Sequence, residues 1–320
     1  MKALVTGGSG FIGVHVVDRL LAEGHSVRLF KRKATAPEQF HGKNIELYQG
    51  DLEDTQSVMK AMTGADIFFH IGEIKNITRS AAEKNVALVE QIVRTLADEG
   101  VRRFIFISSI TVAGIPSSVP ADEDTKAAVT LRDQYTTYKR RCEEILREHM
   151  HGCEYAVIRP APVYGLGSRY LGKMVNAMEV LGPIGLPFIG DARNMAPLIH
   201  VKDLAAAICR AGSEPAASGQ TFNITDGLSH TWFDFFHEIA DALGKKLRII
   251  PLPSLLLKLV GAPIDMFSGF LGFDLDPMHY IEYFSKNLMF SNKKAKTLLN
   301  WQPDYALFDG VREMVAYYRR

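Results

Sequence analysis

The segment Thr6–Gly13 reads TGGSGFIG and follows directly on an apolar run, Lys2–Thr6. An amphipathic stretch, Ile12–Ala22, comes next, so the order predicts a strand, a glycine loop and a helix. The three spaced glycines would let a phosphate pair approach the backbone, and the helix would offer it free N–H groups and the positive end of its dipole. We therefore predict a dinucleotide-binding loop. The alternative is a tight turn that only requires glycine.

Short apolar runs and amphipathic stretches alternate beyond this loop. The apolar runs lie at Val27–Phe30, Ile45–Gln49, Ile67–His70, Phe104–Ser108 and Tyr155–Arg159. The amphipathic stretches lie at Thr55–Met62, Ala81–Glu99 and Tyr135–His149. Alternation at this spacing predicts an α/β protein with a Rossmann-type, doubly wound parallel sheet.

The regular alternation ends after Arg159, where glycines and prolines cluster from Gly165 to Pro197. We predict a dinucleotide-binding Rossmann domain at residues 1–165 and a smaller α/β substrate-binding portion at residues 166–320. Strands expected near Gln220–Ile224 and Leu247–Ile250 either return to the main sheet or pair with each other. Further helices are expected at Val201–Ala211, Trp232–Leu243 and Leu307–Tyr318.

Composition narrows the class of protein. The 320 residues are 47% hydrophobic and 23% charged, as in globular proteins that bury a core. A net charge of +1 argues against a nucleic-acid partner. The three cysteines, Cys142, Cys153 and Cys209, form no Cys-x-x-Cys pair. We therefore expect no disulfide framework and no metal site, but reduced thiols in a cytoplasmic protein.

We expect neither a signal peptide nor a membrane span. The amino terminus has only a short apolar run before its glycines, too short for a signal sequence. The most apolar segment, Ile249–Phe273, is interrupted by prolines and by Lys258 and Asp265, so it lacks the clean apolar length of a span. An amphipathic helix that lines an apolar pocket fits this segment better, and contact with a membrane surface is left open.

Two basic residues follow the second predicted strand. An acidic residue in this region holds the ribose 2′-hydroxyl of NAD, whereas a basic residue suits the 2′-phosphate of NADP. Lys31 and Arg32 occupy the position, so NADP(H) is favoured over NAD(H). A solvated basic loop is the alternative.

Tyr135 and Lys139 stand four residues apart on a predicted helix, and therefore on one face of it. A phenol with a pKa of about 10 is a poor acid–base catalyst at neutral pH. A nearby ammonium and an oxidised nicotinamide ring would both favour the phenolate; lowering its pKa by about 3 units corresponds to about 4 kcal/mol. An ordinary surface pair is the alternative. Tyr138 has the wrong spacing to Lys139 for this role.

Together these motifs resemble those of the extended short-chain dehydrogenase/reductase superfamily, specifically its NAD(P)-dependent epimerase/dehydratase family. The matching segments are TGGSGFIG, GDL (Gly50–Leu52), FFH (Phe68–His70), NV (Asn85–Val86), FISS (Phe106–Ser109), YTTYK (Tyr135–Lys139), RPAPVYG (Arg159–Gly165), IHVKD (Ile199–Asp203) and FNI (Phe222–Ile224). They keep the family's order along the chain.

The resemblance implies a cofactor site whose residues come from these motifs. Asp51 and Leu52 would lie by the adenine, and His70–Gly72 beside the ribose and nicotinamide. Glu73 ends an Ile-Gly-Glu run that replaces the family's small, Ala-rich one. For His70 a structural role in the core is the alternative. The full expected set is Gly7, Gly10, Phe11, Ile12, Gly13, Lys31, Arg32, Asp51, Leu52, His70, Ile71, Gly72, Asn85, Tyr135, Lys139, Pro160 and Val163.

The resemblance also implies three catalytic residues, Ser109, Tyr135 and Lys139. Ser109 would hydrogen-bond the carbonyl oxygen, with Thr111 as the second choice. Tyr135 would act as general acid when a ketone is reduced by hydride from nicotinamide C4. Lys139 would also hold the ribose hydroxyls.

Two departures from the family bear on the substrate. Sugar-nucleotide members usually have an Asn where this chain has Pro162, and an Arg where it has Ala196. Both anchors hold substrate phosphates, which charge-assisted hydrogen bonds recognise. Arg193 would be a substitute. RPAPVYG and GDARN look more like the 3β-hydroxysteroid dehydrogenase and dihydroflavonol reductase branches, which handle apolar ketones and alcohols.

We therefore expect an oxidoreductase for a small apolar ketone or alcohol. Leu255–Phe273 would suit such a substrate, with a plain structural helix as the alternative. A sugar-nucleotide epimerase or dehydratase is the second hypothesis, and a non-catalytic dinucleotide sensor or assembly factor the third. In relatives the helices at 81–99 and 135–149 form a homodimer interface; the sequence leaves this partner open here.

Overall fold

The structure, a computed structural model, describes residues 1–33, 35, 37–74, 78–150, 152–181, 184–259 and 277–319. Its largest element is a seven-stranded sheet of order β12-β8-β5-β4-β1-β2-β3, in which every neighbouring pair is parallel. The strands are β1 (Lys2–Thr6), β2 (Ser26–Lys31), β3 (Ile45–Gln49), β4 (Ile67–His70), β5 (Arg103–Ile107), β8 (Glu154–Pro160) and β12 (Gln220–Ile224). The predicted fold class is confirmed.

The strand order reverses at β1, because β2 and β3 extend the sheet on one side of it and β4 begins the other side. In open parallel sheets, ligands bind outside the carboxyl ends of the strands at such a reversal. The segment Gly7–Gly10 leaves β1 at this point and leads into α1 (Phe11–Ala22). The topology therefore places the glycine loop where a ligand site is expected.

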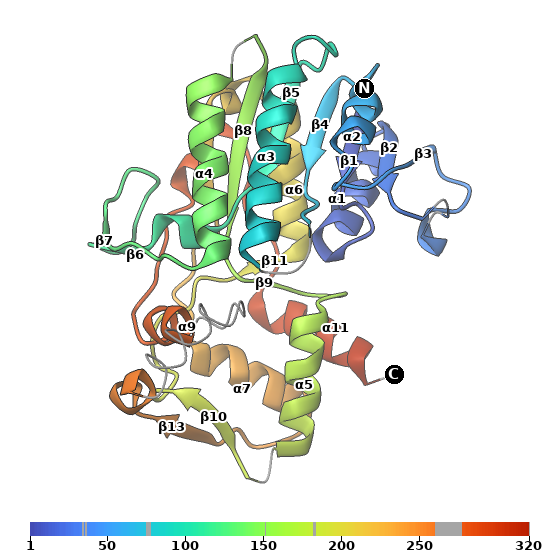
Figure 1. The fold of residues 1–320 in the computed structure, drawn as a ribbon. Coiled ribbons are helices and arrows are strands. Elements are labelled where there is room, and N and C mark those ends of the chain that lie inside the picture. The colour runs from blue at the N-terminus through green and yellow to red at the C-terminus, as the bar shows by residue number, and fades with distance from the viewer. Residues whose placement is uncertain are drawn as a thin grey trace.

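Helices cover both faces of the sheet, which explains why its central strands are apolar along their length: every residue of β4, for example, is buried. One face carries α1 and α6 (Val201–Ser213), and the other α2 (Thr55–Met62), α3 (Arg79–Thr95) and α4 (Gln134–His149). Figure 1 shows α3 and α4 in front of the sheet and α6 behind it.

The helices of the front layer begin at residues whose side chains accept a backbone N–H. Asp54 caps α2, Thr78 caps α3 and Asp133 caps α4, each by accepting the N–H three residues further on. Ser, Thr, Asp and Asn are favoured at this position because they satisfy an N–H group that has no partner within the helix. The cap at Asp133 fixes the start of α4, and with it the place of Tyr135.

A second, smaller region lies below the sheet in Figure 1. Its core is rich in aromatic residues, among them Trp232, Phe235 and Phe236 of α7. Its helices are α5 (Arg169–Leu181), α7 (Trp232–Ala242), α9 (Pro277–Phe284) and α11 (Leu307–Tyr318), and its paired strands are β9 (Val163–Tyr164) with β11 (Ile199–His200) and β10 (Leu186–Ile189) with β13 (Ile249–Leu252). The remaining elements are β6 (Ile115–Pro116), β7 (Ala127–Val129), α10 (Lys293–Leu298), and the 3-10 helices η1 (Glu38–Phe40), η2 (Ile110–Ala113) and η3 (Pro215–Ala217).

The sequence prediction left two strand pairings open and did not include helix α5. The strand at Gln220–Ile224 joins the main sheet beside β8, whereas β13 pairs with β10. Helix α5 lies within the stretch expected to be irregular. A Cβ at Gly172 of α5 would lie 2.6 Å from the Tyr318 ring, so this glycine allows two helices to pack closely and does not end the helix.

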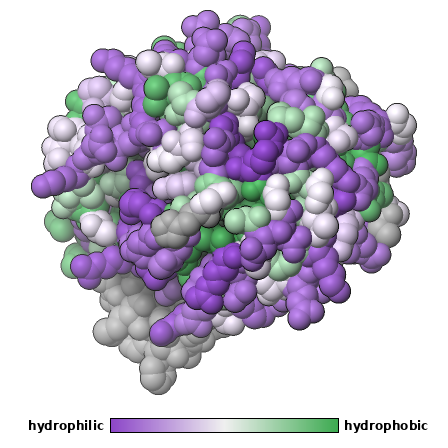
Figure 2. Space-filling view, turned by 90° about the horizontal axis from the view of Figure 1, so that it is seen from above, coloured by the Kyte–Doolittle hydropathy of each residue, from purple (hydrophilic) through white to green (hydrophobic). Residues whose placement is uncertain are grey.

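The apolar segment 249–273 is described as far as residue 259, and the rest of it lies outside the described residues. Within the ranges given above, no helix has both the length and the apolar character needed to cross a membrane. Seen from above in Figure 2, hydrophilic residues dominate the surface, and hydrophobic residues form smaller patches between them.

Candidate active site

A groove of about 1110 Å³ opens along the carboxyl ends of β1, β2, β3 and β4. Most of the residues predicted to bind the cofactor line it: Gly7, Gly10, Phe11, Ile12, Gly13, Lys31, Arg32, Asp51, Leu52, Ile71 and Gly72. Seven further residues that were not predicted to bind the cofactor also line the groove: Ser9, Phe30, Lys33, Gly50, Glu53, Glu73 and Ile74. Most of these directly adjoin a predicted residue, which is the signal that would have found them.

The glycine loop is packed so tightly that side chains would not fit. A Cβ at Gly13 would lie 2.1 Å from the Gly7 carbonyl oxygen, and one at Gly7 would lie 2.5 Å from the Gly72 nitrogen. Gly7 also has a φ of 71°, which L side chains rarely adopt. Gly10 caps α1 without a side-chain hydrogen bond, so the first-turn N–H groups remain available at the groove. These features fit the pyrophosphate of a dinucleotide.

The basic residues after β2 also border this groove. The Lys31 ammonium donates a hydrogen bond to the backbone oxygen of Thr35, while the Gln49 amide donates to the backbone oxygen of Arg32 at 3.2 Å. Side-chain hydrogen bonds to backbone oxygens therefore hold this loop, and both Lys31 and Arg32 line the groove. Their contact with a 2′-phosphate stays a prediction.

A chain of hydroxyl groups leads to Tyr135. Thr136 Oγ1 donates to Thr111 Oγ1 at 3.0 Å, and Thr111 Oγ1 donates to Ser109 Oγ at 2.9 Å. Ser109 is close enough to Tyr135 to lower the pKa of its phenol. Ser109 and its second choice Thr111 are thus members of one network, in which Thr111 orients Ser109. Thr136 was not predicted to belong to the site. Its position directly after Tyr135 in the sequence was the one feature that could have indicated it.

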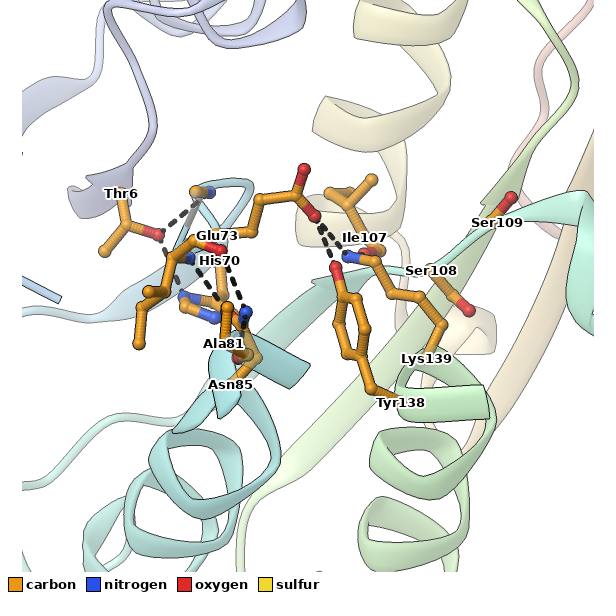
Figure 3. Close-up of polar contacts among 12 residues, drawn as sticks. Thr6, His70, Glu73, Ala81, Asn85, Ile107, Ser108, Ser109, Tyr138 and Lys139 are labelled. Carbon is orange, nitrogen blue, oxygen red and sulfur yellow. Dashed lines mark hydrogen bonds and ion pairs between the residues drawn. The ribbon is translucent and has the colours of Figure 1, made fainter. Parts of the chain in front are cut away.

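Lys139 reaches the same place from one turn further along α4. Its buried ammonium donates to the Ile107 carbonyl at 2.8 Å and lies 5.7 Å from the centre of the Tyr135 ring. It also lies 3.6 Å from Glu73 Oε2. Figure 3 shows Lys139 and Tyr138 converging on the Glu73 carboxylate, with Ser109 at the edge of the view. The structure therefore brings the predicted Tyr135–Lys139 pair together. Neither residue is among the described residues that line the groove, but Lys139 lies 3.6 Å from the lining residue Glu73.

The electrostatic setting of Tyr135 differs from the expectation. Burial raises the pKa of the phenol above its ordinary value, and the negative charges of Glu73 and Asp133 raise it further, while Ser109 lowers it. The Lys139 ammonium, which was expected to lower this pKa, lies 3.6 Å from Glu73 Oε2. The protein residues alone thus favour protonated Tyr135.

His70 and Asn85 lie beneath the groove lining. The His70 ring packs among Phe68, Phe104 and Phe106, and its Nδ1 is 2.9 Å from Thr6 Oγ1. Burial and then the charge of Lys139 lower its pKa to about 3, so the ring is neutral. This placement favours the core role for His70.

Asn85 bonds the loop that carries Glu73. Its side chain accepts from the Ile74 N–H at 2.9 Å and donates to the Ile74 carbonyl at 3.0 Å. It therefore holds the groove wall from behind. Pro160 is buried at the end of β8, and Val163 pairs with Ile199 in the β9–β11 ladder. Asn85, Pro160 and Val163 are therefore not among the described residues that line the groove.

Within the described part of the chain, no group of three His, Cys, Asp or Glu side chains is arranged to hold a metal ion. The three cysteines are free thiols.

Comparison with known proteins agrees with this geometry. Residues 3–225 match the model of the NAD dependent epimerase/dehydratase family. A 3-beta-hydroxysteroid dehydrogenase of Mycolicibacterium neoaurum is 28% identical over 338 residues, covering 99% of this chain and 91% of that protein. A UDP-glucose 4-epimerase of Mycolicibacterium smegmatis is 27% identical over 338 residues, covering 100% of this chain and 99% of that protein.

The fold is also that of solved structures. The X-ray structure of Pal from Bacillus thuringiensis superposes with a TM-score of 0.79 at 23% identity, covering 100% of this chain and 99% of that one. At this identity the likeness concerns the fold. The two relatives above differ in substrate class, so similarity alone does not choose between an apolar alcohol and a nucleotide sugar.

Proposed function

The chain belongs to the NAD-dependent epimerase/dehydratase family, and we propose that it transfers hydride between a nicotinamide cofactor and a ketone or secondary alcohol of a small apolar molecule. The observation that supports this proposal is the grouping of Ser109, Tyr135 and Lys139, in which Lys139 contacts Glu73 of the groove lining. A positioned hydroxyl, a proton donor and an ammonium next to a dinucleotide site form a recognisable acid–base set.

Each residue has a role that follows from its contacts. When bound, the nicotinamide supplies or accepts the hydride. Ser109, oriented by Thr111, holds the substrate oxygen, and Tyr135 donates a proton to that oxygen in reduction and removes it in oxidation. Lys139, anchored on the Ile107 carbonyl, holds the cofactor ribose and places a positive charge near the phenol.

The apolar substrate is supported by the missing phosphate anchors. Ala196 is buried and offers no charge, and Pro162 has no side-chain donor. The substitute Arg193 is exposed, with its guanidinium 5.4 Å from the Phe233 ring and 3.8 Å from Asp191. Without these charge-assisted hydrogen bonds a substrate diphosphate would be poorly held.

A sugar-nucleotide epimerase or dehydratase is the second candidate, favoured by the epimerases among the similar proteins. The third, a non-catalytic dinucleotide-binding protein, would not require the Ser109–Tyr135–Lys139 set. NADP(H) is the proposed cofactor, because Lys31 and Arg32 border the groove and β2 ends without an acidic residue.

The outward residues of α3 and α4 bear on self-association. They include Glu90 paired with Arg94 and Arg141 paired with Glu144, all at the surface. A homodimer through the helices at 81–99 and 135–149, which the sequence left open, would have to desolvate these charges. Light scattering at micromolar concentration tests whether this homodimer forms.

The proposed reaction is tested by a screen of steroid-like and flavonoid-like ketones, plain cyclic ketones and nucleotide sugars with NADPH and NADH. Ketone-dependent oxidation of the reduced cofactor that needs Tyr135 supports the proposal. Epimerisation of a nucleotide sugar supports the second candidate. Tight cofactor binding without turnover of any compound supports the third.

A further inference from the structure

Glu73 is an acidic residue at the edge of the groove where the resemblance leads us to expect a small one. It follows Gly72 directly and lies in the groove lining, and its side chain is 42% exposed. The loop that carries it is held from behind by Asn85, which bonds both backbone groups of Ile74. The carboxylate is therefore held close to the residues that face it.

Those residues belong to α4. The Lys139 ammonium lies 3.6 Å from Glu73 Oε2, and the Tyr138 hydroxyl donates to the same oxygen. In Figure 3 the Glu73 side chain extends towards both. Since Lys139 is buried, with its side chain 6% exposed, this pair is screened less than a pair in open solvent.

The other charged and titratable groups near this point act in both directions. On α4 and at its cap, Tyr138 and Asp133 face Tyr135, and Cys142 and Glu143 lie further along the helix. His70 of β4 is neutral. Arg159 of β8 pairs with Glu143. Compared with these groups, the charge of Glu73 raises the pKa of Tyr135 the most. Glu73 also lies 3.6 Å from the Lys139 ammonium.

We propose that Glu73 is a positioning residue of the Tyr135–Lys139 pair: its carboxylate fixes the Lys139 ammonium at the groove and sets the pH at which Tyr135 changes from general acid to general base. This inference rests on the proposed function of that pair. Glu73 acts through Tyr135 and Lys139 and needs no contact with the substrate. Its consequence is that Tyr135 stays protonated, and competent to reduce a ketone, at higher pH than it would beside a neutral residue.

The sign follows from electrostatics. A negative charge near the phenol disfavours the phenolate and raises the pKa of Tyr135. Glu73→Gln keeps the size and an acceptor for Tyr138 but removes the charge. The pH above which ketone reduction declines should then fall, by about half a unit or more for a partly exposed charge close to the pair.

The experiment measures the pH profile of ketone reduction for wild type, E73Q, E73D and the surface control E144Q. A parallel titration follows tyrosinate absorbance of the NADP⁺-saturated protein, as the difference between each protein and its Tyr135→Phe counterpart. E73Q should move both midpoints down, E73D should leave them between wild type and E73Q, and E144Q should match wild type. If E73Q unfolds within a few degrees of the wild-type temperature, its fold is intact and the shift of the midpoints is electrostatic.

Two failures are distinguishable. If Y135F is inactive and NADP⁺ binds, but the midpoints of E73Q coincide with those of wild type, Glu73 has no such role and the proposed function stands. If Y135F keeps its activity, or if neither NADP⁺ nor NAD⁺ binds, the proposed function itself fails. In that case the inference about Glu73 falls with it.

Discussion

Arg159 on β8 and Glu143 on α4 form a buried ion pair, with Arg159 Nε 2.9 Å from Glu143 Oε1 and Nη2 bonded to Oε2. The Ser108 hydroxyl donates to the same carboxylate. Glu143 lies one turn after Lys139, and Ser108 directly precedes Ser109. The pair therefore joins the strand ends and the helix from which the three proposed catalytic residues project.

Removing one partner of this pair should destabilise the protein strongly. Arg159→Met leaves a carboxylate buried without its counter-charge, and such changes cost about 3–5 kcal/mol. The double change Arg159→Met with Glu143→Leu should recover much of that loss. Urea unfolding measures the free energy of unfolding of both variants. The control is Arg141→Met, which breaks a surface ion pair and should cost less than about 1 kcal/mol. Equal losses for the single and double variants would contradict this account.

Tyr135→Phe should reduce turnover by about 10² to 10⁴, the contribution typical of a general acid–base group. Cofactor affinity should change little, because the ring keeps its packing. The matched control is Tyr138→Phe, which removes a hydroxyl from the neighbouring ring bonded to Glu73. Steady-state rates and fluorescence titration with NADPH test the pair. If Y135F keeps activity within about threefold of wild type, Tyr135 is not the general acid, because a threefold loss is far smaller than the expected 10² to 10⁴.

NADP(H) should bind about 10- to 100-fold more tightly than NAD(H), which corresponds to about 1.4 kcal/mol per tenfold. The physical reason is pairing of the 2′-phosphate with Lys31 and Arg32, part of whose strength is lost to solvent screening. The double change Lys31→Asp with Arg32→Asn should invert the preference, and rising salt should reduce it. Arg94→Asp, a basic surface residue of α3, is the control. Equal affinities at low salt would mean that the basic loop is only solvated.

Nucleotide sugars should bind weakly, because Pro162 and Ala196 stand where polar anchors are needed. Calorimetry with uridine and thymidine diphosphate sugars at saturating cofactor measures this. A ketone that is turned over provides the positive control. Low-micromolar binding of any nucleotide sugar would return the epimerase hypothesis to first place.

The buried His200 should make the protein less stable in mild acid. Its ring stacks on Tyr305 at 4.0 Å, and neither ring nitrogen has a hydrogen-bond partner within the described ranges. Burial lowers its pKa to about 4, so the unfolded chain takes up a proton that the folded chain does not. Stability supplied by this residue is present above about pH 6.5 and is lost as the pH falls from there towards about 4.

His200→Leu should remove this part of the acid dependence, which is at most about 1.4 kcal/mol per pH unit for one proton. Urea unfolding at pH 7, 6, 5 and 4 measures the slope. His237→Leu, at an exposed position of α7, is the control for loss of a histidine. Parallel curves for wild type and H200L would exclude His200 as the cause.

The sheet could be predicted from the sequence because most of its strands are runs of apolar residues, buried at the centre of the sheet. Lys2–Thr6, Ile45–Gln49, Ile67–His70 and Gln220–Ile224 have the predicted bounds. Helix α5 was missed because Gly172, taken as part of an irregular stretch, is there to allow contact with Tyr318. Local signals thus predicted local elements, and a packing contact between distant segments decided the exception.

The same division holds in the site. The four-residue spacing predicted that Tyr135 and Lys139 lie together, since helical geometry alone requires it. The contact between Glu73 and Lys139 spans 66 positions and depends on how the β4 loop and α4 meet across the sheet. No periodicity reports such a contact. The sequence identified Glu73 as a departure, and only the structure indicates what it touches.

The core beneath the glycine loop has a consequence for biosynthesis. Val16 and Val17 of α1 pack in one cluster with Ile208 of α6, Phe222 of β12 and Trp301. Trp301 in turn donates to the Asp203 carbonyl at 3.0 Å. The helix expected to hold the phosphates is thus supported by residues that leave the ribosome almost 300 positions after it. A nascent chain that ends near residue 165 would lack α6 and the rest of this support, so we expect it to hold the cofactor less tightly than the full chain.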